Sequence, residues 1–223
     1  MIIAIDGPAG AGKSTVARAV ARELGLEVLD TGAMYRAVAW RALEAGIDPE
    51  DAAACARVAR SIALEFDDHG RIRIDGEPGE PAIRGGAVTR AVSAVSAHPG
   101  VRAAIVPLQR ARARQGRGVV AEGRDIGSVV FPDADFKFFL TASPEVRARR
   151  RARELGAPGR EAEILAELRR RDRLDATRAD SPLVQAADAV LLDTDALDAE
   201  AAASAILARI QSSESRSGGE SRA

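Results

Sequence analysis

The chain has 223 residues, of which 46% are apolar and 29% charged, and a formal net charge of −1. This is the composition of a globular protein with one or two domains, and so small a charge excludes a global field for nucleic acid or an anionic membrane. A single cysteine, Cys55, excludes an intrachain disulfide, and two distant histidines, His69 and His98, do not form a metal cluster.

The N-terminal region alternates short apolar runs with amphipathic segments. Residues 1–5 ("MIIAI") and 26–30 ("LEVLD") read as buried strands. Each precedes a predicted helix, 13–24 and 33–45, and both helices end at a glycine. Strand, helix, strand and helix at this spacing predict a parallel α/β sheet.

Residues 47–97 break that rhythm and read as an inserted α+β subdomain. A helical segment (49–63) comes first, and the alternating stretches 64–68 and 71–76, with His69 and Gly70 between them, predict a hairpin. The stretch that follows it is turn-rich.

The second half of the chain returns to the α/β pattern. It predicts a helix at 99–115, strands at 118–123, 135–142 and 189–194, charged helices at 143–155 and within 157–179, and a closing helix at 195–210. The domains expected are a core (1–46, 98–142 and 179–211), the monophosphate-binding insert (47–97), a helical lid with its following helix (143–178) and a disordered tail (212–223). The fold class predicted is α/β, with a five-stranded parallel sheet flanked by helices.

The segment "GPAGAGKST" matches the phosphate-binding loop G-x-x-x-x-G-K-[ST], between a predicted strand and a predicted helix as that motif requires. Its glycines let successive N–H groups point inward, where the helix dipole adds positive potential. Lys13 would reach the outer phosphates, and the Ser14 hydroxyl suits Mg²⁺. The predicted ATP-binding residues are Gly7, Pro8, Ala9, Gly10, Ala11, Gly12, Lys13, Ser14 and Thr15.

The rest of the sequence narrows the class of P-loop protein. A chain without asparagine cannot contain the guanine-reading N-K-x-D loop of regulatory GTPases. Only Lys13 and Lys137 are lysines among 32 basic residues, so a lysine in the loop indicates a required ammonium group. Large motor ATPases need longer chains. A kinase of a small molecule remains.

Arginines at predicted strand ends indicate an acceptor that itself carries phosphate. Arg36, Arg124 and Arg178 follow elements expected at the carboxyl edge of the sheet, where ligands of α/β proteins bind. Guanidinium groups fork onto phosphate oxygens. The alternative is that these are surface arginines of an arginine-rich protein.

A run of arginines in 143–155 suggests a lid that closes over the transferring group. The run contains Arg147, Arg149, Arg150, Arg151 and Arg153. Successive residues do not share a helix face, so only some can point inward, and we assign a catalytic role to Arg150. The alternative is a solvated helix face.

Several segments together resemble the bacterial cytidylate kinases. They are "IDGPAGAGKST", "LDTGAMYRA", "VSAVSAHPGVR", "AEGRDIGSVVFPDADFKFFLTAS", "RARRRAREL" and "RDRLDATRADSPLVQAADA", and the resemblance spans residues 1 to about 210. It implies a P-loop kinase fold and transfer of the γ-phosphoryl group of ATP to CMP or dCMP with Mg²⁺.

The resemblance also implies roles for individual residues. Arg36, Arg124 and Arg178 would hold the CMP phosphate, Asp175 and Arg171 would meet the sugar, and Ser93, Arg102 and Asp125 would read the cytosine edge. Thr31 would lie near the acceptor, Ser96 competes with Ser93, and the role of Glu122 stays open. The catalytic set is then Lys13, Arg124, Arg150 and Arg178.

Two alternatives remain at this stage. One is another small P-loop kinase, for UMP or dephospho-coenzyme A, and the other is a non-catalytic nucleotide-sensing module. No stretch approaches the roughly 20 apolar residues of a membrane helix, and the N-terminus lacks the basic segment of a signal peptide. We therefore expect a cytoplasmic monomer that binds ATP and CMP or dCMP and neither nucleic acid nor membrane.

Overall fold

The chain folds around a parallel five-stranded sheet. The computed structural model describes residues 1–67 and 70–220, so His69, in the predicted hairpin turn, lies outside the described residues. The strands lie in the order β2-β6-β1-β7-β8, and every neighbouring pair is parallel. Their bounds are β1 (Ile2–Asp6), β2 (Glu27–Asp30), β6 (Val119–Gly123), β7 (Phe136–Thr141) and β8 (Val190–Asp193). The predicted parallel sheet is confirmed.

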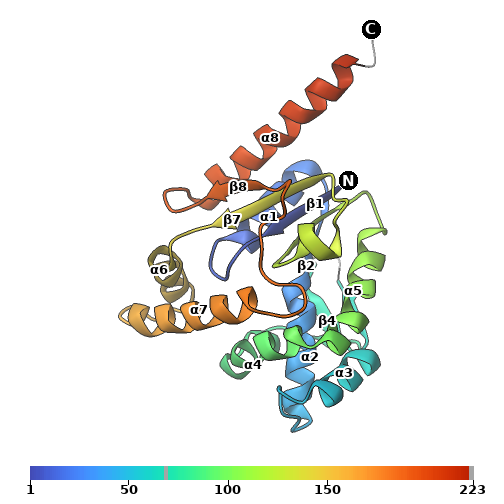
Figure 1. Cartoon of the computed structure of the whole chain (residues 1–223), viewed down its shortest axis with the longest axis vertical. Helices are drawn as coiled ribbons and strands as arrows, with labels where there is room; N and C mark the ends of the chain where they lie inside the picture. Colours follow the sequence, from blue (N-terminus) through green and yellow to red (C-terminus); the bar gives the residue numbers. More distant parts are fainter. Residues whose placement is uncertain (68–69, 221–223) are drawn as a thin grey trace.

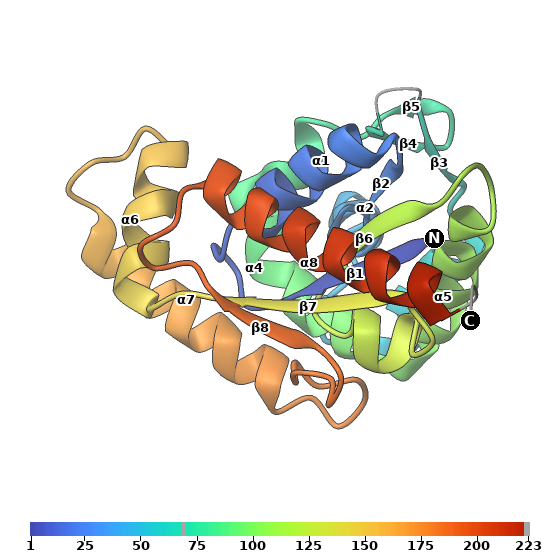
Figure 2. The same ribbon diagram turned by 90° about the horizontal axis from the view of Figure 1, so that it is seen from above.

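Helices cover both faces of this sheet. On one face, α1 (Lys13–Leu24) and α8 (Ala199–Glu220) pack together on Ile3 and Ile5. Figure 2 shows α8 lying across the sheet next to α1. On the other face, an apolar cluster joins α2 (Thr31–Glu44) and α5 (Pro99–Ala113) to Ala4. The alternation of Ile3, Ala4 and Ile5 between the faces is the period-two pattern of a strand buried on both sides.

The insert forms its own small sheet beside the second of these faces. Its elements are α3 (Ala52–Ser61), β3 (Leu64–Phe66), β4 (Ile72–Ile74), β5 (Glu77–Pro78), a 3₁₀ turn (Ala82–Arg84) and α4 (Gly86–Ala97). Strands β3 and β4 are antiparallel, as the predicted hairpin requires, and β5 adds a third strand to them. Helix α4 was not predicted, although its buried Val88, Val92 and Val95 stand at helical spacing.

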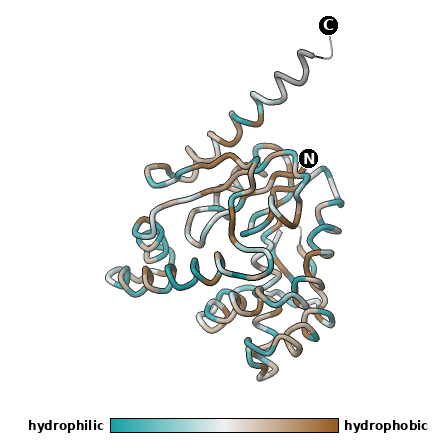
Figure 3. The backbone as a smooth tube through the Cα atoms, in the orientation of Figure 1, coloured by the Kyte–Doolittle hydropathy of each residue, from teal (hydrophilic) through white to brown (hydrophobic). Residues whose placement is uncertain are grey.

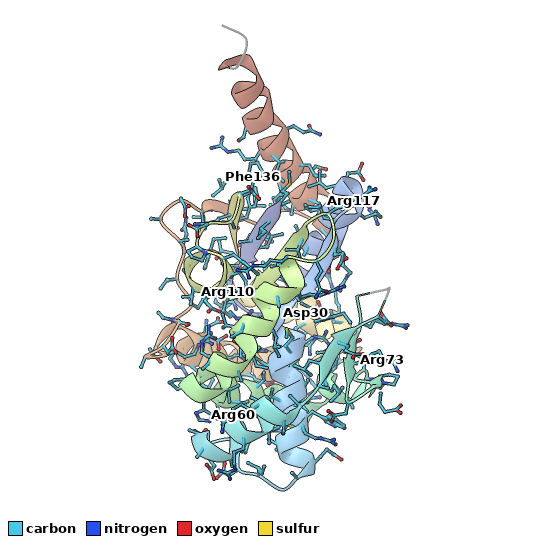
Figure 4. The ribbon with its side chains drawn as sticks, turned by 90° about the vertical axis from the view of Figure 1, so that its right-hand side faces the viewer. Asp30, Arg60, Arg73, Arg110, Arg117 and Phe136 are labelled. Atoms are coloured by element: carbon cyan, nitrogen blue, oxygen red, sulfur yellow. The ribbon has the colours of Figure 1, made fainter. Side chains whose placement is uncertain are left out.

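An ion pair links the insert to the end of β2. Arg84 Nη2 lies 2.8 Å from Asp30 Oδ2, and Arg84 also pairs with Glu80 at 2.7 Å. Figure 4 labels Asp30 where β2 meets α2. The other carboxylate oxygen of Asp30 accepts from the N–H of Ala33, so Asp30 caps α2 and starts that helix directly after the strand.

Two polar helices extend to one side of the sheet. They are α6 (Pro144–Glu154) and α7 (Glu161–Ala176), at the left of Figure 1. Figure 3 shows hydrophobic residues along the sheet strands and hydrophilic ones over much of this helix pair. Its narrow apolar seam consists of Ala148, Ala152, Ile164 and Leu168, packed against Ala9 of the P-loop. The predicted lid helices therefore contact the phosphate-binding loop directly.

The C-terminal helix is longer than predicted. A disordered tail was expected from residue 212, but α8 continues to Glu220, and residues 221–223 lie outside the described part. The hydroxyls of Ser212 and Ser213 donate to the carbonyl of Arg209 at 2.9 and 3.1 Å, which satisfies them within the helix. Among the described residues, no helix is both long and apolar enough to cross a membrane.

Candidate active site

The P-loop connects β1 to α1 and has the backbone that phosphate binding needs. Gly10 and Gly12 have φ of 79° and 90°, in the left-handed region that glycine adopts without strain. A Cβ on Gly7 would lie 2.0 Å from the carbonyl oxygen of Leu140, so only glycine fits there. Because α1 begins at Lys13, the first N–H groups of that helix have no intrahelical partner and face the loop.

Lys13 is buried at the floor of this loop, where its ammonium group donates to the carbonyl of Pro8 at 2.8 Å. Burial lowers the pKa of Lys13 to about 7, and the charge of Arg124 adds to that effect, while Glu122 opposes it. The lysine of the donor site and an arginine predicted for the acceptor site are therefore electrostatic neighbours.

Four arginines, here called the arginine cluster, lie close to one another: Arg36 of α2, Arg171 of α7, Arg124 in the loop after β6 and Arg178 in the loop after α7. Arg124 and Arg171 are also close to Lys13. Burial, with Arg84 and Arg124 as further causes, lowers the pKa of Arg36 to about 10. Burial and Arg124 lower that of Arg171 to about 9. Cations packed this closely repel one another, and an anion between them relieves the repulsion. The geometry is that of a site for a highly charged anion, as predicted for the acceptor phosphate.

Asp175, in the last turn of α7, holds two of these arginines. Its carboxylate accepts from Arg124 Nε at 2.8 Å, and its Oδ1 lies 3.8 Å from Arg178 Nη2. Burial alone would raise the pKa of Asp175, but Arg124, Arg171 and Arg178 hold it below its ordinary value. This ionised carboxylate aligns the guanidinium groups, so Asp175 orients the cluster in addition to its expected contact with a sugar.

A buried ion pair lies next to the arginine cluster. Arg102 of α5 pairs with Asp125, and only 3% and 4% of these residues are exposed. The Arg102 guanidinium also stands 5.6 Å from the centre of the Tyr35 ring. Burial raises the pKa of Asp125, against the opposing charges of Arg102 and Arg178. A carboxylate and a guanidinium side by side present an acceptor and donors for the edge of a base.

The two candidate serines, Ser93 and Ser96, both lie on helix α4 and differ in their hydrogen bonds. The Ser96 hydroxyl donates to the carbonyl of Ser93 at 3.3 Å, so it is satisfied inside its own helix. Ser93 is a buried residue, and its hydroxyl makes no hydrogen bond to residues 1–67 or 70–220. Of the two, Ser93 is therefore the one with a hydroxyl left for a ligand.

Thr31 has a contact that the sequence did not predict. Its hydroxyl donates to the carbonyl of Glu122 at 2.6 Å, which ties the start of α2 to the end of β6. It stands beside the acceptor residues, since a Cβ on Gly123 would lie 2.7 Å from Thr31 Oγ1. Thr31 therefore positions this strand end, and its place near the acceptor stays a prediction.

The tight packing at Gly123 gives a first testable prediction. A Cβ there would also lie 2.6 Å from Ile126 Cδ1, a fully buried side chain. We expect Gly123→Ala to reduce the free energy of unfolding by about 1–3 kcal/mol through overpacking, and to raise the KM for the acceptor. Gly86→Ala, with only an ordinary contact to Arg90, is the matched control for the denaturation measurement. Equal stability of the two variants would contradict the packing argument.

Among the lid arginines, Arg150 and Arg147 have different partners. The Arg150 guanidinium donates to Thr194 and to the carbonyl of Leu197, in the loop between β8 and α8, and its catalytic role stays a prediction. Arg147 is the buried one: it donates to the carbonyl of Ala9 in the P-loop at 3.1 Å and pairs with Asp172 at 2.7 Å. One helical turn on, Arg151 lowers the pKa of both Arg36 and Arg171 by its charge.

The spacing of these three arginines places them on two sides of one helix face. Around the helix, Arg151 lies about 40° from Arg147 on one side, and Arg150 lies about 60° from Arg147 on the other side and about 100° from Arg151. The face that carries Arg147 and Arg151 packs toward the P-loop. Sequence spacing alone could not decide which face that would be.

An oxygen ligand suited to a cation lies at the start of α1. The Ser14 hydroxyl lies close to the carboxylate of Glu122 and lowers its pKa, whereas burial and the charge of Asp30 raise the pKa of Glu122 overall. Among the described residues, no group of three or more His, Cys, Asp and Glu could hold a metal ion. The hydroxyl of Ser14 with phosphate oxygens fits Mg²⁺, which prefers few protein ligands and keeps several waters.

Two contacts were missed at the sequence level. One is the Arg147–Asp172 pair that joins α6 to α7, and the other is a buried carboxylate, Asp6, that binds the chain just after Asp125. An aspartate directly before the P-loop, in an otherwise apolar strand, was the available signal for the second contact. The first had no signal, because it depends on how the two helices pack.

A parallel sheet with the P-loop after its central strand, and a group of arginines close to the lysine of that loop, are the features of a P-loop kinase. Residues 3–212 match the family described as cytidylate kinase. The chain belongs to the cytidylate kinase family.

Individual relatives agree with that family. The chain is 52% identical over 215 residues to a cytidylate kinase of Pelotomaculum thermopropionicum, covering 93% of this chain and 95% of that one. It is 56% identical over 198 residues to a cytidylate kinase of Mycobacterium leprae, covering 87% and 88%. Among solved structures, an uncharacterized protein from Eubacterium ventriosum shares the fold with a TM-score of 0.55 and 13% identity, over 95% of this chain and 99% of that one.

Proposed function

We propose that this protein transfers the γ-phosphoryl group of ATP to CMP and dCMP. The observation that carries the proposal is the buried Arg102–Asp125 pair placed directly beside the arginine cluster. The pair suits the edge of a base, and the arginines suit a phosphate. Because Asp125 follows Arg124 in the chain, one segment serves both ends of a nucleoside monophosphate.

The chemistry of the pair favours cytosine over uracil. The carboxylate of Asp125 can accept from the exocyclic amino group of cytosine, and uracil has a carbonyl at that position. Two facing acceptors in a buried site would leave both unpaired, which is costly. Ser93, with its hydroxyl not bonded to the described chain, is proposed as a further contact to the base.

For the acceptor phosphate, we propose binding by Arg36, Arg124 and Arg178, with Arg171 and Asp175 at the sugar. The donor triphosphate would lie in the P-loop, with Lys13 at its outer phosphates. Ser14 would hold Mg²⁺, which when bound supplies charge neutralisation at the phosphate oxygens.

The reaction needs little covalent chemistry from the protein. An oxygen of the acceptor phosphate forms a bond to the γ-phosphorus as the bond to the ADP oxygen breaks. The acceptor phosphate is already anionic at neutral pH, so no general base is required. Lys13, Arg124 and the arginines of the lid stabilise the charge of the transition state and hold the reactants in line.

The same reasoning assigns the remaining parts of the chain. Residues 47–97 would serve as the monophosphate-binding subdomain, and 143–178 as a lid in which Arg147 and Arg151 face the phosphates. We propose that the protein acts as a monomer. The need for ATP and CMP, together with a single cysteine, supports a cytoplasmic location.

A coupled assay of ADP formation with CMP, dCMP, UMP, AMP, GMP and dephospho-coenzyme A tests the proposal. We expect the highest kcat/KM for CMP or dCMP. Turnover of UMP or dephospho-coenzyme A at rates above those of CMP would identify a different small P-loop kinase. Nucleotide binding without transfer to any acceptor would identify a sensing module.

Replacing Asp125 by asparagine tests the base contact itself. We expect the ratio of kcat/KM for CMP over that for UMP to fall roughly 10- to 100-fold, because the amide can donate to a uracil carbonyl. A ratio is insensitive to any loss of folded enzyme, so the uncompensated charge of Arg102 does not confound it. Asp188→Asn, which removes a partner of Lys137, should leave the ratio unchanged. An unchanged ratio in Asp125→Asn would exclude base recognition by this residue.

A further inference from the structure

A buried carboxylate outside the expected site connects the donor loop to the acceptor loop. Asp6 is the last residue of β1, directly before Gly7 of the P-loop, and only 4% of it is exposed. Its two carboxylate oxygens accept from the backbone N–H groups of Ile126 and Gly127, at 2.8 and 2.7 Å. One side chain thus holds two consecutive amides from a segment 120 residues away in the sequence.

Those two amides belong to the segment that also carries the predicted acceptor residues. Ile126 and Gly127 begin a single π-helical turn (Ile126–Val130) immediately after Arg124 and Asp125. A short turn of this kind has unbonded N–H groups at its start, and Asp6 satisfies them. The position of Arg124 and Asp125 relative to the P-loop therefore depends on a contact that neither of them makes.

The contact requires a carboxylate in its ionised form. Two N–H donors need two acceptor oxygens, and a protonated acid or an amide would direct a donor at one of them. Burial raises the pKa of Asp6 to about 6, and the charge of Asp125 adds to this, while the two amides and Lys13 lower it. The side chain of Lys137 lies beside Gly127, with its ammonium group bound to Pro132 and Asp188.

We propose that Asp6 is a positioning residue for phosphoryl transfer, and that its ionised carboxylate fixes the segment Arg124–Gly127 relative to the P-loop. The consequence for the reaction rests on the proposed function, because it concerns the alignment of acceptor and donor. The contact of Asp6 with the two backbone amides does not depend on the proposed function. Asp6 touches neither substrate, so its loss should alter how the acceptor is held and leave ATP binding nearly intact.

Steady-state kinetics of Asp6→Asn against the wild type tests this. At pH 8 we expect kcat/KM for CMP to fall about tenfold, with the KM for ATP changed by less than about twofold. As the pH is lowered to 5, the wild type loses its ionised carboxylate, so the ratio of wild type to variant should shrink to about two. Ionisation of the substrates affects both proteins and cancels in the ratio. The charge of Asp6 raises the pKa of Lys13, so the KM for ATP is measured at every pH in both proteins to follow the effect on Lys13.

The other end of the same strand offers a matched control. Asp135 also binds a backbone amide of β1, since its Oδ2 accepts from the N–H of Ile2 at 2.6 Å. Asp135→Asn should leave kcat/KM for CMP unchanged at every pH. A loss in Asp6→Asn that is independent of pH, or one that Asp135→Asn reproduces, would reduce Asp6 to a structural residue and overturn the proposal.

A second measurement needs neither a variant nor turnover. In the wild type, the amide resonances of Ile126 and Gly127 should titrate together with a midpoint near pH 6 as the carboxylate is protonated. Amide shifts that stay constant between pH 5 and 8 would overturn the proposal even if the kinase assay is positive. If the amides titrate but the protein phosphorylates no monophosphate, the contact of Asp6 is retained and only the proposed function is rejected.

Discussion

The Lys13→Met variant should lose about 1,000-fold in kcat/KM, about 4 kcal/mol of transition-state stabilisation. Lys13 is the cation at the floor of the P-loop, buried beside Arg124 and Glu122. In that water-excluded position, one ammonium group aimed at the transferring phosphoryl group stabilises its charge far more than it would in water. Methionine keeps the length and apolar packing of the side chain and removes only the charge and the donors.

The other lysine of the chain is the control for this variant. Lys137 is also buried, and it likewise donates to a proline carbonyl, that of Pro132, besides pairing with Asp188 at 2.7 Å. It lies in β7, outside the arginine cluster. We expect Lys137→Met to lower the melting temperature and to leave kcat/KM within about twofold of the wild type. Near-normal turnover in Lys13→Met would remove this lysine from the reaction.

Arg124→Ala should cost about 2–4 kcal/mol of transition-state stabilisation, roughly a 30- to 1,000-fold loss of kcat/KM. Arg124 is the residue that the structure places between both sites: its charge lowers the pKa of Lys13 and Arg171, and its Nε donates to Asp175. A raised KM for CMP and a reduced kcat are both expected, because the group binds the acceptor phosphate and stabilises transition-state charge.

The loss of Arg124 also leaves Asp175 without its shortest ion pair, so stability must be measured alongside the kinetics. Thermal unfolding of Arg124→Ala gives the folded fraction at the assay temperature, and Arg124→Lys separates charge from the two-pronged guanidinium geometry. Arg117→Ala is the surface control, since Arg117 is an exposed residue on the loop before β6 (Figure 4). Unchanged kinetics in Arg124→Ala would exclude it from the site.

Much of the fold could be read from local pattern. The five strands of the sheet and most helices were predicted near their observed positions, because buried parallel strands leave short apolar runs and helices a 3.6-residue period. Helix α4 was missed, since the stretch up to Gly86 was read as turn-rich and the valines that follow it were assigned to no element. The length of α8 was also misjudged: a serine-rich composition suggested disorder, whereas the Ser212 and Ser213 hydroxyls are satisfied inside the helix.

The candidate site, like the fold, has parts that could be predicted from the sequence and parts that could not. The P-loop was predictable because its function lies in consecutive residues, with glycines at required left-handed positions and a lysine at the helix start. Arg36, Arg124 and Arg178 were predicted from their places at the expected carboxyl edge of the sheet, and the resemblance to a family added Arg171 and a role for each. The structure brings these four arginines together. The role of Arg150 stays a prediction, since the direction in which its helix face points depends on packing.

The sequence by itself determined which chemical groups are available: a phosphate-binding loop and a set of arginines after predicted strands and helices. Those are properties of residue type and local spacing, whereas the aspartate suited to a cytosine edge was implied by the resemblance to a family. Only the tertiary structure decided which of these groups face one another. The β2-β6-β1-β7-β8 order sets β6 beside β1, so that Asp6 meets the amides after Asp125 and Lys13 lies near Arg124. Such contacts join residues more than 100 positions apart, and no local periodicity encodes them, because they arise from the order in which strands pair.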